Sequence, residues 1–538
     1  MRGLMMDVPL TVPMILRRGE ALSPRREVVT RLPDRSLFRS TYADFARRAR
    51  QLASALRRLG LRDGDRVATL CWNHHQHLEA YFGIPLAGGV LHTLNLRLHP
   101  DDLAYIVQHA ADRFLIVDAS LLPLLETFRA RVALERVIVV GAPGTRPGGA
   151  IDYESLVTDG VPGEPFAEPD EHDAAAMCYT TGTTGKPKGV LYSHRALVLH
   201  SLGSALADTL GLAERDSVLP VVPMFHANAW GLPFTAVMVG ARLVFPGPYL
   251  DPASLLELLQ AERVTFTAGV PTIWMGILQA LDSQPGAFDL SSLRTMVVGG
   301  SAAPQSMIEA FERRHGLRIV HAWGMTETTP LGSVAQPTSE IAARPEAEQF
   351  AFRAKQGRPA PLVEIRARGG DGLVPWDGRT MGELEVRGPW VASAYYGEAG
   401  RDERFLDDGW FRTGDIVTID EQGAIAIQDR AKDLIKSGGE WISSVALENA
   451  LMGHPAVAEA AVIPVRHAKW GERPLAVVVL RPGASATADD LCAHLAGQVA
   501  RWWLPDAVEF VDAIPKTSVG KFMKSALRQR FAEYELPA

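Results

Sequence analysis

Apolar residues follow two distinct patterns along the first part of the chain. In residues 41–60 they recur at the 3.6-residue period of a helix, and Gly60 closes the segment. The short run Asp65–Leu70 that follows is typical of a buried strand. The alternation continues with a helix at Leu78–Ala87, a strand at Gly89–Thr93, a helix near Pro100–His109 and a strand at Arg113–Val117. Strands that alternate with helices predict βα units and a largely parallel sheet.

The same alternation returns in the middle of the chain. It predicts strands and helices in turn over Arg242–Phe245, Asp251–Ala261, Thr265–Ala268, Pro271–Leu281, Thr295–Val298, Ser306–His315 and Arg318–Ala322. After about residue 355 the pattern changes to short alternating strands with glycine-rich turns. The segments Glu383–Arg387 and Ile416–Asp420 are examples, and they predict a small antiparallel unit.

The last segment has the pattern of a separate α+β unit. We expect helices at Ser444–Gly453 and Ala488–Ala500 and strands at Val457–Val465 and Leu475–Leu480. The predicted fold is therefore a large α/β N-terminal domain of residues 1–429, with doubly wound sheets and a small β-barrel-like unit. A smaller, mobile α+β C-terminal domain of residues 430–538 follows it.

Composition narrows the class of protein. Among the 538 residues, 47% are hydrophobic and 22% are charged, which is ordinary for a globular protein, and a net charge of −7 gives no reason to expect a nucleic-acid partner. The three cysteines are far apart and form no C-x-x-C motif, which favours a reducing, cytoplasmic location. The apolar region Val218–Phe245 is interrupted by prolines and polar residues, so we expect a core segment and no transmembrane segment.

The segment Tyr179–Gly189 reads Y-T-T-G-T-T-G-K-P-K-G and has the composition of a phosphate-binding loop. Its glycines allow backbone N–H groups to approach a ligand, and its threonines and lysines add donors and positive charge. It does not fit the Walker A pattern, because only two residues separate Gly182 from Gly185 and Pro187 follows Lys186. A polar surface turn is the alternative. The predicted ATP contacts are Thr180, Thr181, Gly182, Thr183, Thr184, Gly185, Lys186 and Lys188.

This loop, together with seven further segments, resembles the adenylate-forming superfamily, and most closely its bacterial medium- and long-chain fatty-acyl-CoA synthetases. The further segments, in the order and spacing of that family, are Val222–Trp230, Gly299–Pro304, His321–Glu327, Gly409–Asp415, Asp429–Asp433, Ile435–Ile442 and Pro515–Lys521. The resemblance implies an enzyme that joins a fatty acid to AMP and passes the acyl group to coenzyme A. The implied substrates and cofactors are ATP, Mg²⁺ and coenzyme A.

The resemblance assigns the residues that bind the acyl group and the nucleotide. His226, Trp230 and Val270 are expected to line the acyl pocket, with Trp230 as a gate that opens when ATP binds. The other expected nucleotide contacts are Gly299, Gly300, Ser301, His321, Ala322, Trp323, Gly324, Asp415 and Arg430. In this set the Trp323 ring would stack on adenine, and Asp415 would accept hydrogen bonds from the ribose. The family more often has Gly where this chain has Ala322, so its acyl preference need not be that of the family.

The resemblance also assigns the catalytic residues. Lys521 is expected to be the catalytic lysine, acting with Thr326 and Glu327. Magnesium requires oxygen ligands, and Thr181 and Glu327 are the expected ones. Asp429 would be the hinge between the two domains, and the expected contacts to coenzyme A are Lys436, Ser437, Gly438, Gly439, Glu440 and Trp441.

Two other functions remain open. One is a ligase for an aryl or short branched acid on the same fold. The other is a non-catalytic nucleotide-binding regulator, which the joint presence of Glu327, Asp415 and Lys521 disfavours. An amino-acid substrate is also disfavoured, because no acidic residue between Met224 and Leu232 could hold its ammonium group. Members of the family are often homodimers through the N-terminal domain, which is a further expectation for this chain.

Overall fold

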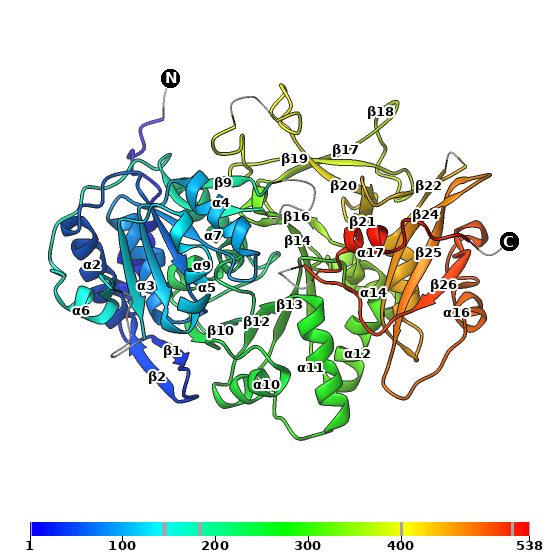
Figure 1. Ribbon diagram of the computed structural model, residues 1–538, viewed down its shortest axis with the longest axis horizontal. Coiled ribbons are helices and arrows are strands. Elements are labelled where there is room, and N and C mark those ends of the chain that lie inside the picture. The colour runs from blue at the N-terminus through cyan, green and yellow to red at the C-terminus, as the bar shows by residue number, and fades with distance from the viewer. Residues whose placement is uncertain are drawn as a thin grey trace.

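The computed structural model describes residues 1, 3–141, 148–180, 186–398, 402–438, 440–517 and 521–536. Figure 1 shows a broad N-terminal part, a sheet that lies over it, and a C-terminal part at one end of the molecule. The described strands form four sheets, of nine, seven, five and five strands. The predicted fold class is confirmed.

The seven-stranded sheet has the order β7-β6-β5-β3-β4-β8-β9 and is parallel except for its last pair. Its strands are β3 (Arg66–Leu70), β4 (Val90–Thr93), β5 (Phe114–Asp118), β6 (Arg136–Val140), β7 (Ile151–Asp152), β8 (Ala174–Tyr179) and β9 (Gly189–Ser193). The accompanying helices are α2 (Tyr42–Arg58), α3 (His75–Leu86), α4 (Pro100–Ala110), α5 (Leu122–Glu126) and α6 (Tyr153–Thr158). A capping box of Thr41 and Asp44 starts α2, whose apolar face is buried against α3.

The nine-stranded sheet has the order β16-β15-β14-β13-β12-β10-β11-β1-β2. Its six central strands, from β14 to β1, are parallel. The strands are β1 (Glu27–Arg31), β2 (Leu37–Thr41), β10 (Ser217–Pro220), β11 (Arg242–Phe245), β12 (Phe266–Gly269), β13 (Thr295–Val298), β14 (Ile319–Gly324), β15 (Leu331–Val334) and β16 (Arg358–Pro359). The helices of this part are α1 (Val12–Leu22), α7 (His194–Ala205), α8 (Ala227–Trp230), α9 (Leu232–Val239), α10 (Pro252–Ala261), α11 (Pro271–Ser283), α12 (Gln305–His315), α13 (Ser339–Ala342) and α14 (Glu346–Ala354).

One continuous core joins the two large sheets. Phe45 of α2, Ile116 of the seven-stranded sheet and Phe245 of the nine-stranded sheet belong to the same buried cluster. Trp390, in the connection between two strands of the next sheet, is part of it as well. Because these sheets share their core, the loops at the ends of their strands are held at fixed positions around a common site.

A five-stranded antiparallel sheet follows, as the sequence predicts. It has the order β18-β17-β19-β20-β21. The strands are β17 (Glu364–Gly369), β18 (Gly372–Leu373), β19 (Gly382–Arg387), β20 (Phe411–Ile419) and β21 (Ile425–Arg430). Asp415 of β20 faces Arg430 of β21 in the ladder, which places two residues of the predicted nucleotide site side by side.

The C-terminal part is built on a second five-stranded sheet with helices packed against it. Its strands are β22 (Ile435–Ser437), β23 (Glu440–Ile442), β24 (Val457–His467), β25 (Gly471–Leu480) and β26 (Ala507–Phe510), and its helices are α15 (Ser444–Met452), α16 (Ala488–Leu495) and α17 (Lys524–Arg530). Separate apolar clusters cover the two faces, one with Leu447 of α15 and one with Leu527 of α17. This part therefore has cores of its own.

Some boundaries differ from those predicted. The helix expected over Ala488–Ala500 ends at Leu495, because Ala496 is extended and Gly497 has a φ of +85°. The predicted core segment Val218–Phe245 contains β10, α8, α9 and β11. Within the described residues, no helix is long and apolar enough to cross a membrane.

Candidate active site

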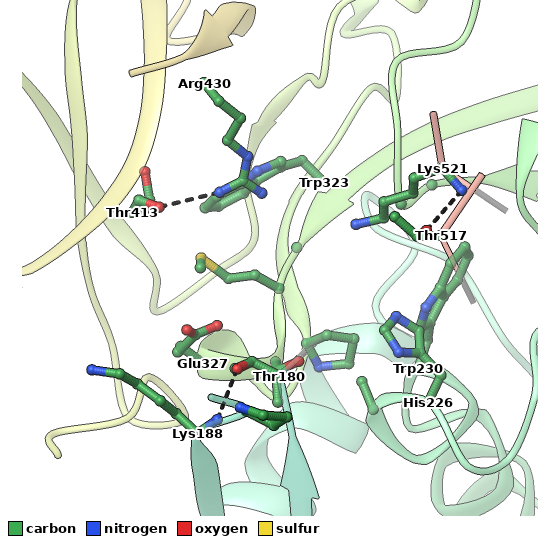
Figure 2. Close-up of a pocket in the computed structure, with 18 of the residues that line it drawn as sticks. Thr180, Lys188, His226, Trp230, Trp323, Glu327, Thr413, Arg430, Thr517 and Lys521 are labelled. Atoms are coloured by element: carbon green, nitrogen blue, oxygen red, sulfur yellow. Dashed lines mark hydrogen bonds between the residues drawn. The ribbon is translucent and has the colours of Figure 1, made fainter. Parts of the chain in front are cut away.

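A cavity of about 610 Å³ lies where the N-terminal sheets meet the C-terminal part. Its lining includes the ends of the β8–β9 hairpin, the segment Ala322–Glu327, parts of the antiparallel sheet, and the loop that precedes α17. Residues of α4, of α8 and of α17 also contribute. Figure 2 shows Glu327, Thr180 and Lys188 on one side, with His226, Trp230 and Lys521 on the other. Of the predicted residues, the cavity is lined by Thr180, Lys186, Lys188, His226, Trp230, Gly299, Gly300, Ala322, Trp323, Gly324, Thr326, Glu327, Arg430 and Lys521.

The phosphate-binding loop connects two antiparallel strands. Thr180 donates its backbone N–H to the carbonyl of Lys188 at 2.9 Å, and the backbone N–H of Lys188 donates to Thr180 Oγ1 at 3.1 Å. These two bonds close the neck of the loop (Figure 2). A hairpin loop differs from a Walker A loop, which runs from a strand into a helix. Residues 181–185, which include the predicted contacts from Thr181 to Gly185, lie outside the described residues.

The two lysines that follow this loop are held by aromatic rings and carboxylates. Lys186 Nζ lies 4.8 Å from the centroid of the Tyr105 ring. Lys188 Nζ lies 4.8 Å from the centroid of the Tyr395 ring, and it forms ion pairs with Asp402 and with Glu398.

Glu327 supplies a buried carboxylate at the cavity wall. Its side chain is 3% exposed as part of the short 3₁₀ turn after β14. Tyr395 donates its hydroxyl to Glu327 Oε1 at 2.5 Å, and Arg404 Nη1 lies 3.8 Å from the same oxygen. Both of these contacts fall on Oε1, so Oε2 is the oxygen that remains for a ligand. A carboxylate oxygen is a preferred ligand of Mg²⁺, and the residues present therefore fit a magnesium ion.

Trp323, Asp415 and Arg430, three of the predicted nucleotide contacts, form a connected group. Trp323 donates its indole N–H to Asp415 Oδ2 at 3.0 Å, and Arg430 Nε lies 2.8 Å from Asp415 Oδ1. Asp415 is 1% exposed and lies behind its two partners, so it is not among the lining residues. Each carboxylate oxygen has a second lone pair, which keeps Asp415 able to accept a hydrogen bond from a ligand.

Trp230 belongs to an unusual stretch of backbone. Ala227, Asn228, Ala229 and Trp230 all have positive φ angles, from +42° to +57°, and Gly231 continues the turn at +73°. The left-handed conformation costs about 1–2 kcal/mol for each non-glycine residue, so this turn is strained. It directs Trp230 against Gly299, where an added Cβ would lie 3.1 Å from the indole ring. The absence of a side chain at Gly299 therefore makes room for Trp230.

Lys521 enters the cavity from the C-terminal part, beside Gly300. A Cβ added at Gly300 would lie 3.5 Å from Lys521 Cε and 3.4 Å from Val270 Cγ1, which brings three predicted residues together. Burial and the nearby charge of Arg430 lower the pKa of Lys521 to about 8.

His226 is electrically neutral in this setting. Burial, together with the charge of Lys521, lowers its pKa to about 3. A neutral imidazole can orient a carboxylate by hydrogen bonding, but it adds no positive charge. The positive charge near His226 is therefore that of Lys521, whose charge also lowers the pKa of His226.

Several predicted residues lie away from the cavity wall. Ser301 is exposed, and His321 is 1% exposed with its ring held by the carbonyl of Ala354. Val270 is not among the lining residues, although its side chain lies near Gly300, which is. The coenzyme A residues Lys436, Ser437, Gly438, Glu440 and Trp441 form the β22–β23 hairpin outside the cavity, and Gly439 lies outside the described residues.

Asp429 connects the antiparallel sheet to the C-terminal part. It is 1% exposed at the end of β21, and its carboxylate accepts hydrogen bonds from the backbone N–H and the hydroxyl of Ser444, the first residue of α15. Lys524 Nζ of α17 lies 3.9 Å from the same carboxylate. The residue expected to be a hinge is thus bonded to the segment that would move.

The structure adds lining residues from outside the segments that the sequence singled out. They include Tyr105, His109, Tyr396, Glu398, Arg404, Lys524 and Arg528. It also adds Thr413, Lys432 and Asp433, which lie within those segments but were not assigned a role. The stretch between β19 and β20 is rich in charged residues, which is a weak indication of a binding role. The sequence gave no indication that its carboxylates Glu398 and Asp402 pair with Lys188.

Comparisons with known proteins agree with this geometry. A family model described as AMP-binding enzyme matches residues 17–396, and one described as AMP-binding enzyme C-terminal domain matches residues 446–521. A long-chain-fatty-acid–CoA ligase of Thermus thermophilus is 51% identical over 98% of this chain and 97% of its own length.

Two further curated relatives also span nearly the whole chain. A 3-methylmercaptopropionyl-CoA ligase of Ruegeria pomeroyi is 45% identical over 99% of both chains. A medium-chain-fatty-acid–CoA ligase of Ectopseudomonas oleovorans is 43% identical over 99% of this chain and 98% of its own. Among solved structures, the anthranilate CoA ligase AuaEII in complex with anthranoyl-AMP superposes with a TM-score of 0.87 at 27% identity, over 98% of each chain. The chain belongs to the AMP-binding enzyme family.

Proposed function

We propose that this protein is an AMP-forming ligase that activates a fatty carboxylic acid with ATP and transfers the acyl group to coenzyme A. The observation that carries the proposal is the convergence on one cavity of Trp323 and Glu327, from the end of β14 and the turn after it, with Lys521 from the C-terminal part. The similarity to a long-chain-fatty-acid–CoA ligase over almost the full length supports the substrate class.

The first half-reaction would join two anions. A carboxylate oxygen of the acid attacks the α-phosphorus of ATP, and the bond from that phosphorus to the pyrophosphate oxygen breaks. Lys521 offsets the charge where the acid approaches, while Lys186 and Thr180 hold the phosphates at the opposite side. Glu327 would hold Mg²⁺, which neutralises charge on the phosphates. No side chain becomes acylated, so positioning and electrostatics provide the catalysis.

The second half-reaction would use a different face of the C-terminal part. The thiol of coenzyme A attacks the acyl carbonyl of the adenylate, and AMP leaves. We propose that the domain boundary lies at residues 429–430, and that rotation about Asp429 removes Lys521 and brings in the β22–β23 hairpin. Two features support this: the bonds of Asp429 to Ser444, and the position of the hairpin outside the cavity while Lys521 is inside.

The acyl preference is open to a direct test. Ala322 lines the cavity next to the Trp230–Gly299 contact, and its methyl group reduces the space available to an acyl chain. A relative at 45% identity is named for a short thioether acid, which favours including short acids in the test. We expect a saturated fatty acid to be the preferred substrate, with aryl and short branched acids as the alternative.

The test is a series of acids from four to eighteen carbons, with benzoate and isobutyrate added, assayed by ATP–pyrophosphate exchange with and without coenzyme A. We expect exchange that depends on the acid, and acyl-CoA only when coenzyme A is present. A preference for benzoate or isobutyrate would replace the fatty-acid assignment. Absence of exchange with every acid would instead favour a non-catalytic regulator.

The pH dependence of adenylation should report the charge of Lys521. Its pKa of about 8 means that the ammonium is charged below pH 8 and neutral above it. Because the charged form is the active one, kcat/KM for adenylation should be level below pH 8 and fall about tenfold per pH unit above it. Lys521→Arg should move this fall to higher pH, even if its maximum rate is lower. A fall at the same pH in both proteins would contradict the assignment.

The location and assembly of the protein are further proposals. The free cysteines Cys71, Cys178 and Cys492 are consistent with a cytoplasmic protein. A homodimer through the N-terminal domain rests on the family resemblance alone, and light scattering of the purified protein would decide it.

A further inference from the structure

The segment between β19 and β20 carries a tyrosine that contacts both ends of the phosphate site. Tyr395 is 6% exposed, and its hydroxyl donates to Glu327 Oε1 at 2.5 Å. On its ring, Lys188 Nζ and the guanidinium carbon of Arg404 each lie 4.8 Å from the centroid. The backbone N–H of Ala392 also donates to the carbonyl of Glu327 at 2.8 Å, which is a second bond between this segment and the 3₁₀ turn that contains Glu327.

The hydroxyl contact fixes the direction of a carboxylate. A hydrogen bond to a charged group is stronger than one between neutral groups, and a buried acceptor that loses its donor is costly. The Tyr395 hydroxyl is the donor in this contact, and Glu327 Oε1 is its acceptor. Because Oε1 accepts the Tyr395 hydroxyl, rotation of the carboxylate would break this bond, and neither of the two contacts on Oε1 involves Oε2.

The ring contacts hold two cations. Cations lie favourably over an aromatic face, and the gain increases where water is excluded. Lys188 also forms ion pairs with Glu398 and Asp402, and Arg404 forms an ion pair with Asp402. The two cations on the Tyr395 ring are therefore also joined to each other through the carboxylate of Asp402. Phe405 packs against the Tyr395 ring at a centroid distance of 5.1 Å and limits its movement.

We propose that Tyr395 is a positioning residue that couples the metal-binding carboxylate of Glu327 to the phosphate-binding lysine Lys188. Its hydroxyl orients Glu327 toward Mg²⁺, and its ring holds the Lys188 ammonium beside the phosphates. The proposal rests on the function proposed above, and it names a residue that forms this site without touching the reacting atoms.

The two contacts can be separated by substitution. Tyr395→Phe removes the hydroxyl and keeps the ring, whereas Tyr395→Leu removes both. The matched control is Tyr534→Phe, because Tyr534 also donates its hydroxyl to a glutamate, Glu509, at 2.7 Å and lies outside the cavity. Binding of Mn²⁺ together with ATP is measured by electron paramagnetic resonance, and the Mg²⁺ dependence of pyrophosphate exchange is measured on the same full-length proteins.

We expect Tyr395→Phe to weaken Mn²⁺ binding and raise the half-saturating Mg²⁺ concentration about tenfold, with the KM for ATP changed less than about threefold. Tyr395→Leu should additionally raise the KM for ATP about fivefold, because Lys188 loses its aromatic contact. Tyr534→Phe should match the wild type. If Tyr395→Leu fails to fold, Tyr395→Phe still decides the hydroxyl contact, since it keeps the shape of the buried ring.

Two results would overturn the proposal: wild-type Mn²⁺ binding in Tyr395→Phe, or an equal loss in Tyr534→Phe. Failure of the proposed function would look different. In that case wild-type protein would show no exchange with any acid, while the Mn²⁺ measurement would still report whether Tyr395 orients Glu327.

Discussion

Lys521→Ala should lower adenylation of the acid about a thousandfold and leave thioester formation from a preformed acyl adenylate within about threefold of the wild type. The reason is that Lys521 is the cation beside Gly300, where the acid must approach the α-phosphate. Removing one preorganised donor to a developing charge costs about a hundred- to a thousandfold, and here a full charge is lost as well. The second half-reaction joins a thiol to a neutral carbonyl and does not need this charge.

The measurement compares ATP–pyrophosphate exchange with acyl-CoA formation from synthetic acyl adenylate. Lys516→Ala is the matched control, because Lys516 lies in the same loop but pairs with Glu459 at 2.5 Å outside the cavity. The control should behave as wild type in both assays. An equal loss of both half-reactions in Lys521→Ala would contradict a C-terminal part that presents one face for each step.

Glu327→Gln should lower adenylation about a hundredfold or more and abolish its normal response to Mg²⁺. The amide keeps the shape of the side chain but removes the negative charge that a magnesium ion requires. It also replaces the acceptor of the Tyr395 hydroxyl with a neutral oxygen, so that bond persists in weaker form. Thioester formation from preformed acyl adenylate should again be spared, since no triphosphate takes part.

This variant is tested by titrating Mg²⁺ in the exchange assay. Glu509→Gln is the control, since Glu509 accepts a hydrogen bond from Tyr534 away from the cavity. A normal Mg²⁺ dependence in Glu327→Gln would show that the metal is held elsewhere, and the magnesium assignment would then be wrong.

The fold was largely predictable because periodicity alone distinguishes βα units from antiparallel strands. The predicted strand Arg242–Phe245 has the same bounds as β11. The helix predicted over residues 41–60 corresponds to α2, and the capping box of Thr41 and Asp44 sets where α2 begins. The end of α16 was missed because Ala496 favours a helix by itself, and the positive φ of Gly497 depends on the loop that follows.

The candidate site was predictable from composition alone only at the phosphate-binding loop, whereas the other predicted lining residues, such as Trp323, Glu327 and Lys521, came from the family resemblance. The glycine-, threonine- and lysine-rich loop indicated phosphate from its composition. The role of Asp415, by contrast, depends on Arg430 across the β20–β21 ladder and on Trp323, which is 92 residues away in the sequence. The role of Tyr395 could not be predicted from the sequence. Its contacts to Glu327 and Lys188 form through tertiary packing, and both partners are more than 60 residues away in the chain. The left-handed turn that carries Trp230 was also missed, since alanine and tryptophan have no preference for that conformation.

The central claim is that nucleotide, metal and acid meet in the cavity between the N-terminal sheets and the part that carries Lys521. A crystal structure with a nonhydrolysable acyl adenylate tests it most directly. The account predicts adenine against Trp323, ribose hydroxyls within hydrogen-bonding distance of Asp415, and the acyl chain running past Trp230. An adenylate bound elsewhere, with this cavity filled only by water, would contradict the account.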